Sequence, residues 1–184
     1  MQLVAPTLDR LPAYVAALER GWSADNLRGA AAAREELERI ATDPTAFVAS
    51  LDDRDAKGPP VTLPDGTRVT RLPGYHRWLW DGEFSGQIGL RWQPGSNAVP
   101  ARVLGHIGYA VVPWKQRRGY ATRALALLLP EARAVGLAYV EITTSPDNLA
   151  SRRVIEANGG VLIEHFTRPP EYGSTPALRY RIDL

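Results

Sequence analysis

Residues 108–122 read GYAVVPWKQRRGYAT, and this stretch decides the fold. An apolar run typical of a buried strand ends at Pro113, a short basic loop follows, and Gly119 opens a helix that runs to about Val135. When a helix joins two strands in this way, the strands are parallel neighbours with a right-handed crossover. The stretch therefore predicts an α/β fold with one such unit at its centre.

The segments on either side of this unit alternate between strand and helix patterns. Asp81-Gly82 is a hairpin signal between two strand-like runs, and Gly159-Gly160 ends the last helix. We expect a single domain over residues 1–184, with a mixed sheet of about six or seven strands flanked by helices. The expected strands are 3–4, 67–71 (weakly patterned), 76–80, 84–92, 103–112, 138–143, 161–165 and 178–182; the expected helices are 8–18, 29–40, 44–47, 119–135 and 148–158; and 52–66 is expected to be a loop.

Composition excludes several kinds of chemistry. The 184 residues contain no cysteine, which rules out disulfides, thiolate zinc sites and a cysteine nucleophile. The histidines, His76, His106 and His165, lack the spacing of a zinc enzyme, so we expect no metal. No apolar run approaches the ~18 residues of a membrane span and no signal peptide is evident. We therefore expect a cytoplasmic protein that does not bind membranes.

The charges are balanced overall but uneven locally. The 22 Lys and Arg against 20 Asp and Glu leave a net charge of only +2, which gives no general attraction to nucleic acid. Four basic residues, Lys115, Arg117, Arg118 and Arg123, nevertheless lie within nine positions that hold no acid. They surround a helix N-terminus, where free N–H groups and a missing side chain at Gly119 suit a phosphate. The alternative is a solvated basic turn.

Two separated motifs resemble the GNAT superfamily of N-acetyltransferases. Gln116-x-x-Gly119-x-Ala121 matches the Q/R-x-x-G-x-G/A motif that wraps the pyrophosphate of acetyl-CoA in that family. The later segment, Asn148-x-x-Ser151 followed by ANGG at 157–160, is similar to the family's helix beside the pantetheine arm. GHIGY at 105–109, RRGYAT at 117–122 and VIEANGG at 154–160 further resemble a group of bacterial predicted acetyltransferases. The resemblance is strongest over residues 84–184.

The resemblance implies a GNAT fold with acetyl-CoA as co-substrate. Residues 84–184 would form the acetyl-CoA-binding core and residues 1–60 a helical part on the acceptor side, while the parallel strands near 103–112 and 138–143 would splay apart. The pantetheine arm would pair with Val111 and Val112 and face Asn148 and Ser151. The pyrophosphate would be held by the backbone and side chains of Gln116, Arg117, Arg118, Gly119, Tyr120, Ala121 and Thr122.

The family mechanism is direct attack of an amine on the thioester, which agrees with a chain that has no cysteine. The position of the family's strand carboxylate falls near His106, a candidate base whose ordinary pKa suits neutral pH; Glu83 is the alternative base, and a histidine satisfied within the sheet is the alternative role. Many relatives protonate the thiolate with a tyrosine where this chain has Ile155. Tyr109 is the candidate acid, with Tyr172 or water as alternatives.

The acceptor is expected to be a primary amine on a small molecule, a peptide N-terminus or a lysine. Residues 19–55 hold nine acids and five bases, which favours a cationic acceptor, although a solvated helix face explains these charges as well. We expect a monomer or homodimer that binds no nucleic acid. Two other functions remain open: a CoA-binding sensor without turnover, and a nucleic-acid-binding module using the basic residues with Trp114.

Overall fold

The computed structural model describes residues 1–63 and 65–184, and its elements follow the predicted order. None of the described helices is long and apolar enough to cross a bilayer. The elements are β1 (Gln2–Val4), α1 (Leu11–Glu19), α2 (Ala30–Thr42), α3 (Pro44–Ala49), β2 (Asp52–Asp53), β3 (Val61–Thr62), β4 (Arg68–Val69), β5 (Gly74–Trp80), β6 (Phe84–Arg91), β7 (Ile107–Val111), α4 (Tyr120–Ala134), β8 (Tyr139–Thr144), α5 (Leu149–Glu156), β9 (Val161–Thr167) and β10 (Pro176–Asp183).

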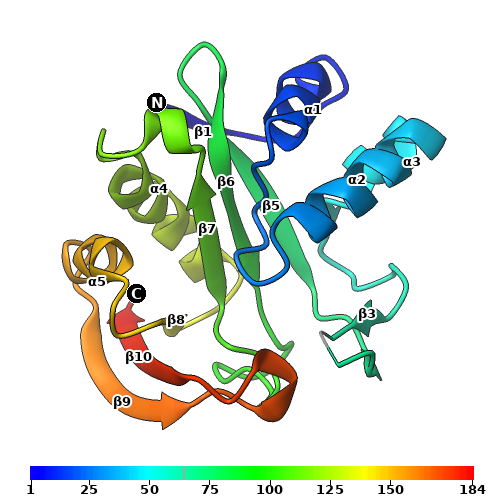
Figure 1. The fold of residues 1–184 in the computed structure, drawn as a ribbon. Helices are drawn as coiled ribbons and strands as arrows, with labels where there is room; N and C mark the ends of the chain where they lie inside the picture. The colour runs from blue at the N-terminus through cyan, green and yellow to red at the C-terminus, as the bar shows by residue number, and fades with distance from the viewer. Residues whose placement is uncertain (64) are drawn as a thin grey trace.

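The strands form two main sheets that meet where β7 lies beside β8 (Figure 1). One sheet has the order β1-β5-β6-β7, with β2 also paired to β5, and the other has the order β8-β10-β9. The small hairpin of β3 and β4 stands apart, inside the segment expected to be a loop. Hydrogen bonding therefore divides the single sheet that we predicted into two, because β7 and β8 form no continuous ladder in the described part of the chain.

The strands β7 and β8 run in the same direction and diverge along their length. At one end, the His106 N–H donates to the Glu141 carbonyl over 2.8 Å. The backbones approach so closely here that a Cβ on Gly105 would lie 2.6 Å from that carbonyl oxygen. Further along β7, Tyr109 contacts Ser151, which comes after β8 in the chain. Later residues of β7 therefore lie near later residues on the β8 side, as in a parallel pair. The predicted parallel crossover through α4 is confirmed, and it leaves the far ends of the two strands apart.

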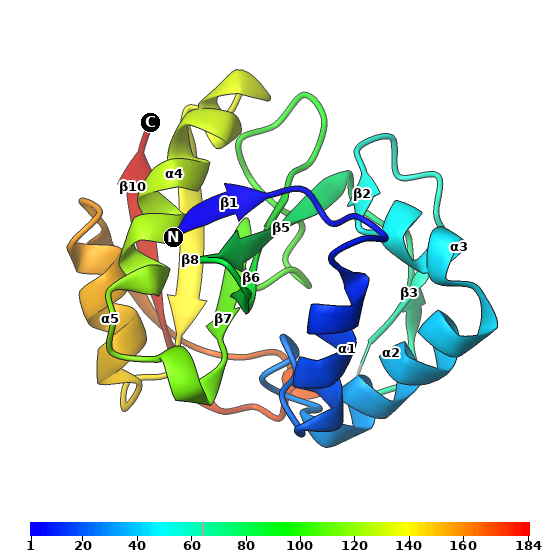
Figure 2. The same ribbon diagram turned by 90° about the horizontal axis from the view of Figure 1, so that it is seen from above.

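Helices cover both faces of the larger sheet (Figure 2). On one face, α4 packs Leu125 and Leu128 into the apolar core beneath β6 and β7. On the other face, α1 to α3 enclose an aromatic cluster in which Tyr14 stacks on Trp78 with ring centroids 5.1 Å apart. Such stacking adds about 0.5–1.5 kcal/mol beyond simple burial. This rigid sheet holds the end of β7 in place.

Candidate active site

A left-handed turn joins β7 to α4. After a short 3₁₀ turn at Pro113–Lys115, Arg117 has a φ of 60°, and Gly119, the N-cap of α4, has a φ of 73°. Left-handed residues that alternate with right-handed ones aim successive N–H groups at one point and make an anion-binding nest. The loop has the shape predicted for a phosphate site.

The backbone donors of this loop are free. Within the described chain, no N–H from residue 117 to residue 122 donates to a protein acceptor, and the first helical bond runs from Arg123 N–H to the Gly119 carbonyl over 3.0 Å. These N–H groups also carry the positive end of the α4 dipole. The structure therefore brings the six predicted amides together as one set of donors without protein acceptors among the described residues.

The side chains around the loop divide into exposed and braced groups. Arg117 and Arg118 are exposed and can reach a bound anion, whereas Gln116 turns back so that its Nε2 donates to the Val111 carbonyl over 3.3 Å. Asn158, from the ANGG segment, donates to the Thr122 carbonyl over 3.2 Å and to the Val154 carbonyl over 2.8 Å. Asn158 thus ties α5 to the first turn of α4, a bracing role that its motif did not reveal.

The prediction that Lys115 is one of the charges of the phosphate site is wrong. Its Nζ lies 2.5 Å from Asp81 and 3.2 Å from Glu83 in the β5–β6 turn, and its side chain is buried. The Tyr120 hydroxyl also donates to Asp81, over 2.6 Å. Burial alone would raise the pKa of Asp81, but these hydrogen bonds outweigh it and hold the pKa well below its usual range. Lys115 therefore fastens the loop to the β5–β6 turn and is not free to meet a phosphate.

The open edge of β7 lies directly before the loop. Val112 N–H donates to the Ser85 carbonyl over 3.1 Å, so this residue faces β6. Because an antiparallel ladder alternates, the backbone groups of Val111 and Tyr109 turn to the opposite edge, toward β8. The Val111 N–H is thus available to pair with a ligand in the gap, although its carbonyl already accepts from Gln116. Val112 is not available, and its fully buried side chain packs on the aromatic side.

Tyr109 and Ser151 meet across the gap. Their hydroxyl oxygens are 2.8 Å apart, and the Tyr109 hydroxyl lies 3.3 Å from the Ser151 carbonyl. Asn148 caps α5 by accepting a hydrogen bond from Ser151 N–H over 3.0 Å, which fixes the serine. Burial raises the pKa of Tyr109 to about 12, so its phenol stays protonated at neutral pH. The pair can deliver a proton to a group that develops negative charge in the gap.

His106 occupies the point where β7 and β8 touch. Its side chain is fully buried; Nδ1 accepts from Glu141 N–H over 2.9 Å, and Nε2 donates to the Asn97 carbonyl over 3.1 Å. Burial lowers its pKa, in agreement with a neutral ring. A general base needs a free nitrogen facing the amine. Since both nitrogens are engaged, the geometry gives His106 a structural role at the start of the splay and does not support the predicted base.

We expect His106→Ala to lower the free energy of unfolding by about 2–4 kcal/mol, because it opens a cavity and leaves the buried Glu141 N–H without a partner. His106→Gln, whose amide can accept from one side and donate to the other, should recover part of this loss. Urea denaturation measures both. A Gln variant of normal stability whose turnover falls by more than 100-fold would restore the base assignment.

Comparison with known proteins identifies the family. A family profile described as "Acetyltransferase (GNAT) domain" matches residues 24–161, most of the chain. The chain therefore belongs to the GNAT acetyltransferases, which use acetyl-CoA as co-substrate. A search of curated protein sequences found no significant match.

Solved structures with similar folds agree with this family. The microcin C7 self-immunity acetyltransferase MccE, solved with acetyl-CoA and AMP, aligns over 99% of this chain and 91% of its own at TM-score 0.64 and 13% identity. RimL, a ribosomal L7/L12 alpha-N-protein acetyltransferase solved with CoA, aligns over 99% and 93% at TM-score 0.66 and 14% identity. Mycobacterium smegmatis RimJ, with CoA-disulfide, is 27% identical over 60% of this chain and 53% of its own, at TM-score 0.51.

Proposed function

We propose that this protein transfers the acetyl group of acetyl-CoA to a primary amine by direct attack in a ternary complex. The observation that supports this most strongly is the set of six N–H groups at residues 117–122, which have no acceptor among the described residues and lie directly beyond the open edge of β7. The pyrophosphate of acetyl-CoA matches the N–H donors of the loop. The amides of its pantetheine arm match the open strand edge beside that loop.

In this proposal the loop supplies most of the cofactor's binding energy. The pyrophosphate accepts from the backbone of residues 117–122, with Arg117 and Arg118 alongside. Hydrogen bonds to charged groups contribute about 1.5–3 kcal/mol each, so three or four would provide most of the ~8 kcal/mol behind a micromolar complex. The pantetheine arm pairs with Val111 and passes Ser151, which directs the thioester toward Tyr109.

The chemical step needs an unprotonated amine and a proton for the leaving thiolate. The amine lone pair attacks the thioester carbonyl, the C–S bond breaks, and the sulfur takes the proton that the Tyr109–Ser151 pair donates. The pair then regains a proton from water, to which the new amide nitrogen has released its own. An alkylammonium with a pKa near 10.4 loses its proton at pH 7 at a cost of about 4.6 kcal/mol. Because His106 has no free nitrogen and Glu83 is paired with Lys115, we propose that the amine enters as the free base and releases its proton to water.

The test is release of CoA from acetyl-CoA with a panel of primary amines. The protein has no cysteine, so a thiol reagent reports the product alone. We expect kcat/KM for a simple alkylamine to rise about tenfold per pH unit from pH 7 to 9, following the free-base fraction. A plateau that begins near pH 6–7 would instead reveal a titrating base on the protein and contradict the free-base step.

A CoA-binding sensor is the alternative function that one observation favours. Ile155 stands at the position where many GNAT relatives carry a tyrosine. Its side chain is fully buried in the apolar core, so α5 supplies no acid at that position. Both functions predict that acetyl-CoA raises Tm at constant salt. Only the enzyme releases CoA when an amine is added, and a panel without turnover would favour the sensor.

A further inference from the structure

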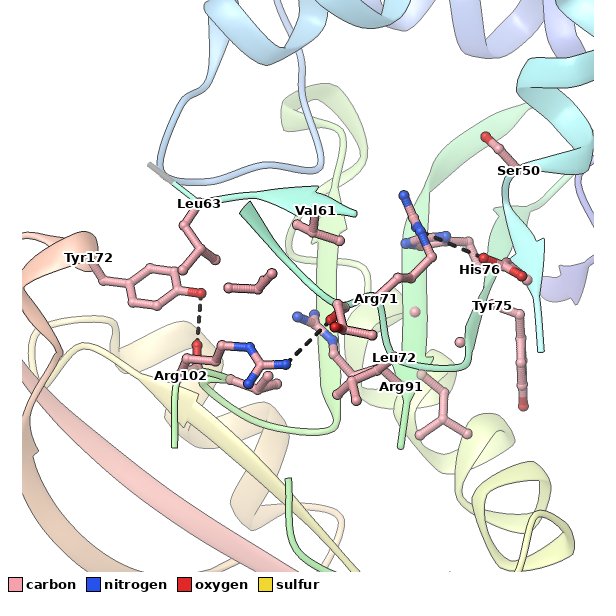
Figure 3. A pocket seen from close by; sticks show the side chains of 17 residues that line it. Ser50, Val61, Leu63, Arg71, Leu72, Tyr75, His76, Arg91, Arg102 and Tyr172 are labelled. Carbon is pink, nitrogen blue, oxygen red and sulfur yellow. Dashed lines mark hydrogen bonds and ion pairs between the residues drawn. The ribbon is translucent and has the colours of Figure 1, made fainter. Parts of the chain in front are cut away.

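A cavity of about 260 Å³ lies on the sheet face that α1 to α3 cover, at the end away from the aromatic cluster. Its floor is formed by β5 and β6, and its walls come from the β3–β4 hairpin and from the segments around Arg102 and Tyr172 (Figure 3). Small-molecule sites usually measure about 300–1,000 Å³, so this cavity suits the end group of a ligand.

The cavity carries an excess of positive charge. Three arginines line it, Arg71, Arg91 and Arg102, against one carboxylate, Asp53. Arg71 Nε lies 3.6 Å from Asp53 and forms an ion pair with it. No other carboxylate among the described lining residues is left to neutralise Arg91 or Arg102. His76 adds no charge, because burial and, secondarily, Arg91 lower its pKa to about 4.

Two of the arginines retain donors for a ligand. Arg91 is an exposed residue at the end of β6, and none of the ion pairs or side-chain hydrogen bonds within the described part of the chain involves its guanidinium. Arg102 donates through Nη2 to the Thr70 carbonyl over 3.3 Å, while its buried Nε has no partner among the described residues. A guanidinium without a partner in a recess is suited to bidentate binding of a carboxylate or phosphate.

The cavity adjoins the strand on which acetyl transfer would take place. Arg91 is on β6, and its Nη2 lies 3.4 Å from the position that a Cβ would take on Gly108 of β7. Gly108 directly precedes Tyr109, whose backbone faces the gap between β7 and β8. A ligand anchored on Arg91 therefore reaches the open edge of β7 by extending over a residue that has no side chain.

We propose that this arginine cavity binds an oxyanion of the acceptor, so that the acceptor class is an amine that carries a carboxylate or phosphate at its other end. The inference rests on the proposed acetyl transfer to an amine. It replaces the expectation of a purely cationic acceptor, because the acids of residues 19–55 on which that expectation depended are largely engaged, as in the Arg28–Glu35 and Arg77–Asp52 pairs.

Paired substrates with and without the anion test this proposal. We expect 4-aminobutyrate or O-phosphoethanolamine to exceed n-butylamine or ethanolamine by about 10- to 100-fold in kcat/KM, the range of one charged hydrogen bond. The two pairs distinguish a carboxylate from a phosphate. Arg91→Gln should lower kcat/KM for the anionic amine to that of its neutral partner, so that the advantage disappears, without a change in the Kd for acetyl-CoA. Arg133→Gln, an equal charge change on the exposed end of α4, is the matched control.

Equal rates with neutral and anionic amines, or an Arg91→Gln variant that keeps the preference, would overturn the proposal. If no amine releases CoA, the proposed function fails and the cavity is judged separately by thermal shift with inorganic phosphate and with glutarate, without acetyl-CoA. An increase in Tm that Arg91→Gln abolishes and Arg133→Gln retains supports the oxyanion site. Equal shifts in all three proteins, or none, refute it.

Discussion

Gly119→Ala is expected to weaken acetyl-CoA binding by about 100-fold while the protein remains folded. Gly119 has a φ of 73°, and a residue with a Cβ in the left-handed region is strained by roughly 1–2 kcal/mol. No protein atom lies within 4 Å of the position of that Cβ, so the core has no reason to rearrange. The Cβ instead enters the space where a phosphate would approach, and it tilts N–H groups worth about 1.5–3 kcal/mol each. Gly119→Val, with a branched side chain, should abolish binding.

Gly136→Ala is the matched control for this substitution. Gly136 lies beyond the other end of α4 with a φ of 92°, and the position of its Cβ is equally open. Both alanine variants should therefore lose similar free energy of unfolding in urea, but only the Gly119 variant should lose affinity in isothermal titration calorimetry. Equal affinities for acetyl-CoA in the two variants would remove the phosphate-loop assignment.

The conformation of the proposed phosphate loop could be predicted from the sequence because its determinants are local. Gly119 must adopt a left-handed conformation, Asn148 caps α5 from within the same turn, and residues 117–122 lie at a helix start whose N–H groups are free by geometry. Each of these depends on neighbours a few positions away, so a short motif contains all the information needed.

The contacts of Lys115 and His106, and therefore their roles, could not be predicted in the same way. Lys115 is neutralised by Asp81, which lies 34 positions earlier, and His106 is enclosed by Asn97 and by Glu141, which lies 35 positions later. A count of local charges treats Lys115 as free, and a motif alignment treats His106 as accessible. Only the tertiary contacts show that one is an anchor and the other a structural residue.

The arginine cavity illustrates the same limit on the acceptor side. Arg71, Arg91 and Arg102 come from segments separated by strands and loops, so no motif contains them, and Arg91 alone reads as an ordinary strand end. The acids of residues 19–55 had suggested a cationic acceptor. The fold instead pairs several of those acids with arginines and brings three other arginines to one cavity whose lining holds a single carboxylate.

Tyr109→Phe is expected to lower kcat by about 10²- to 10⁴-fold, the usual contribution of a positioned general acid, with little change in the Kd for acetyl-CoA. The phenol has a pKa near 12, so it remains protonated, and able to donate, throughout the pH range of the assay. The wild-type enzyme should therefore show no loss of rate from this group up to about pH 11. Tyr139→Phe, at the far end of β8 from Ser151, is the control and should keep full activity.

Ser151→Ala then decides how the proton travels. If Ser151 relays the proton from Tyr109, each single variant breaks the same path, so the double variant should be no slower than the slower single one. If Tyr109 protonates the thiolate directly and Ser151 only orients it through the 2.8 Å hydrogen bond, Ser151→Ala should cost about tenfold and Tyr109→Phe far more. Normal turnover in Tyr109→Phe would exclude both routes, because each of them begins with the phenol proton, and would leave water as the proton donor.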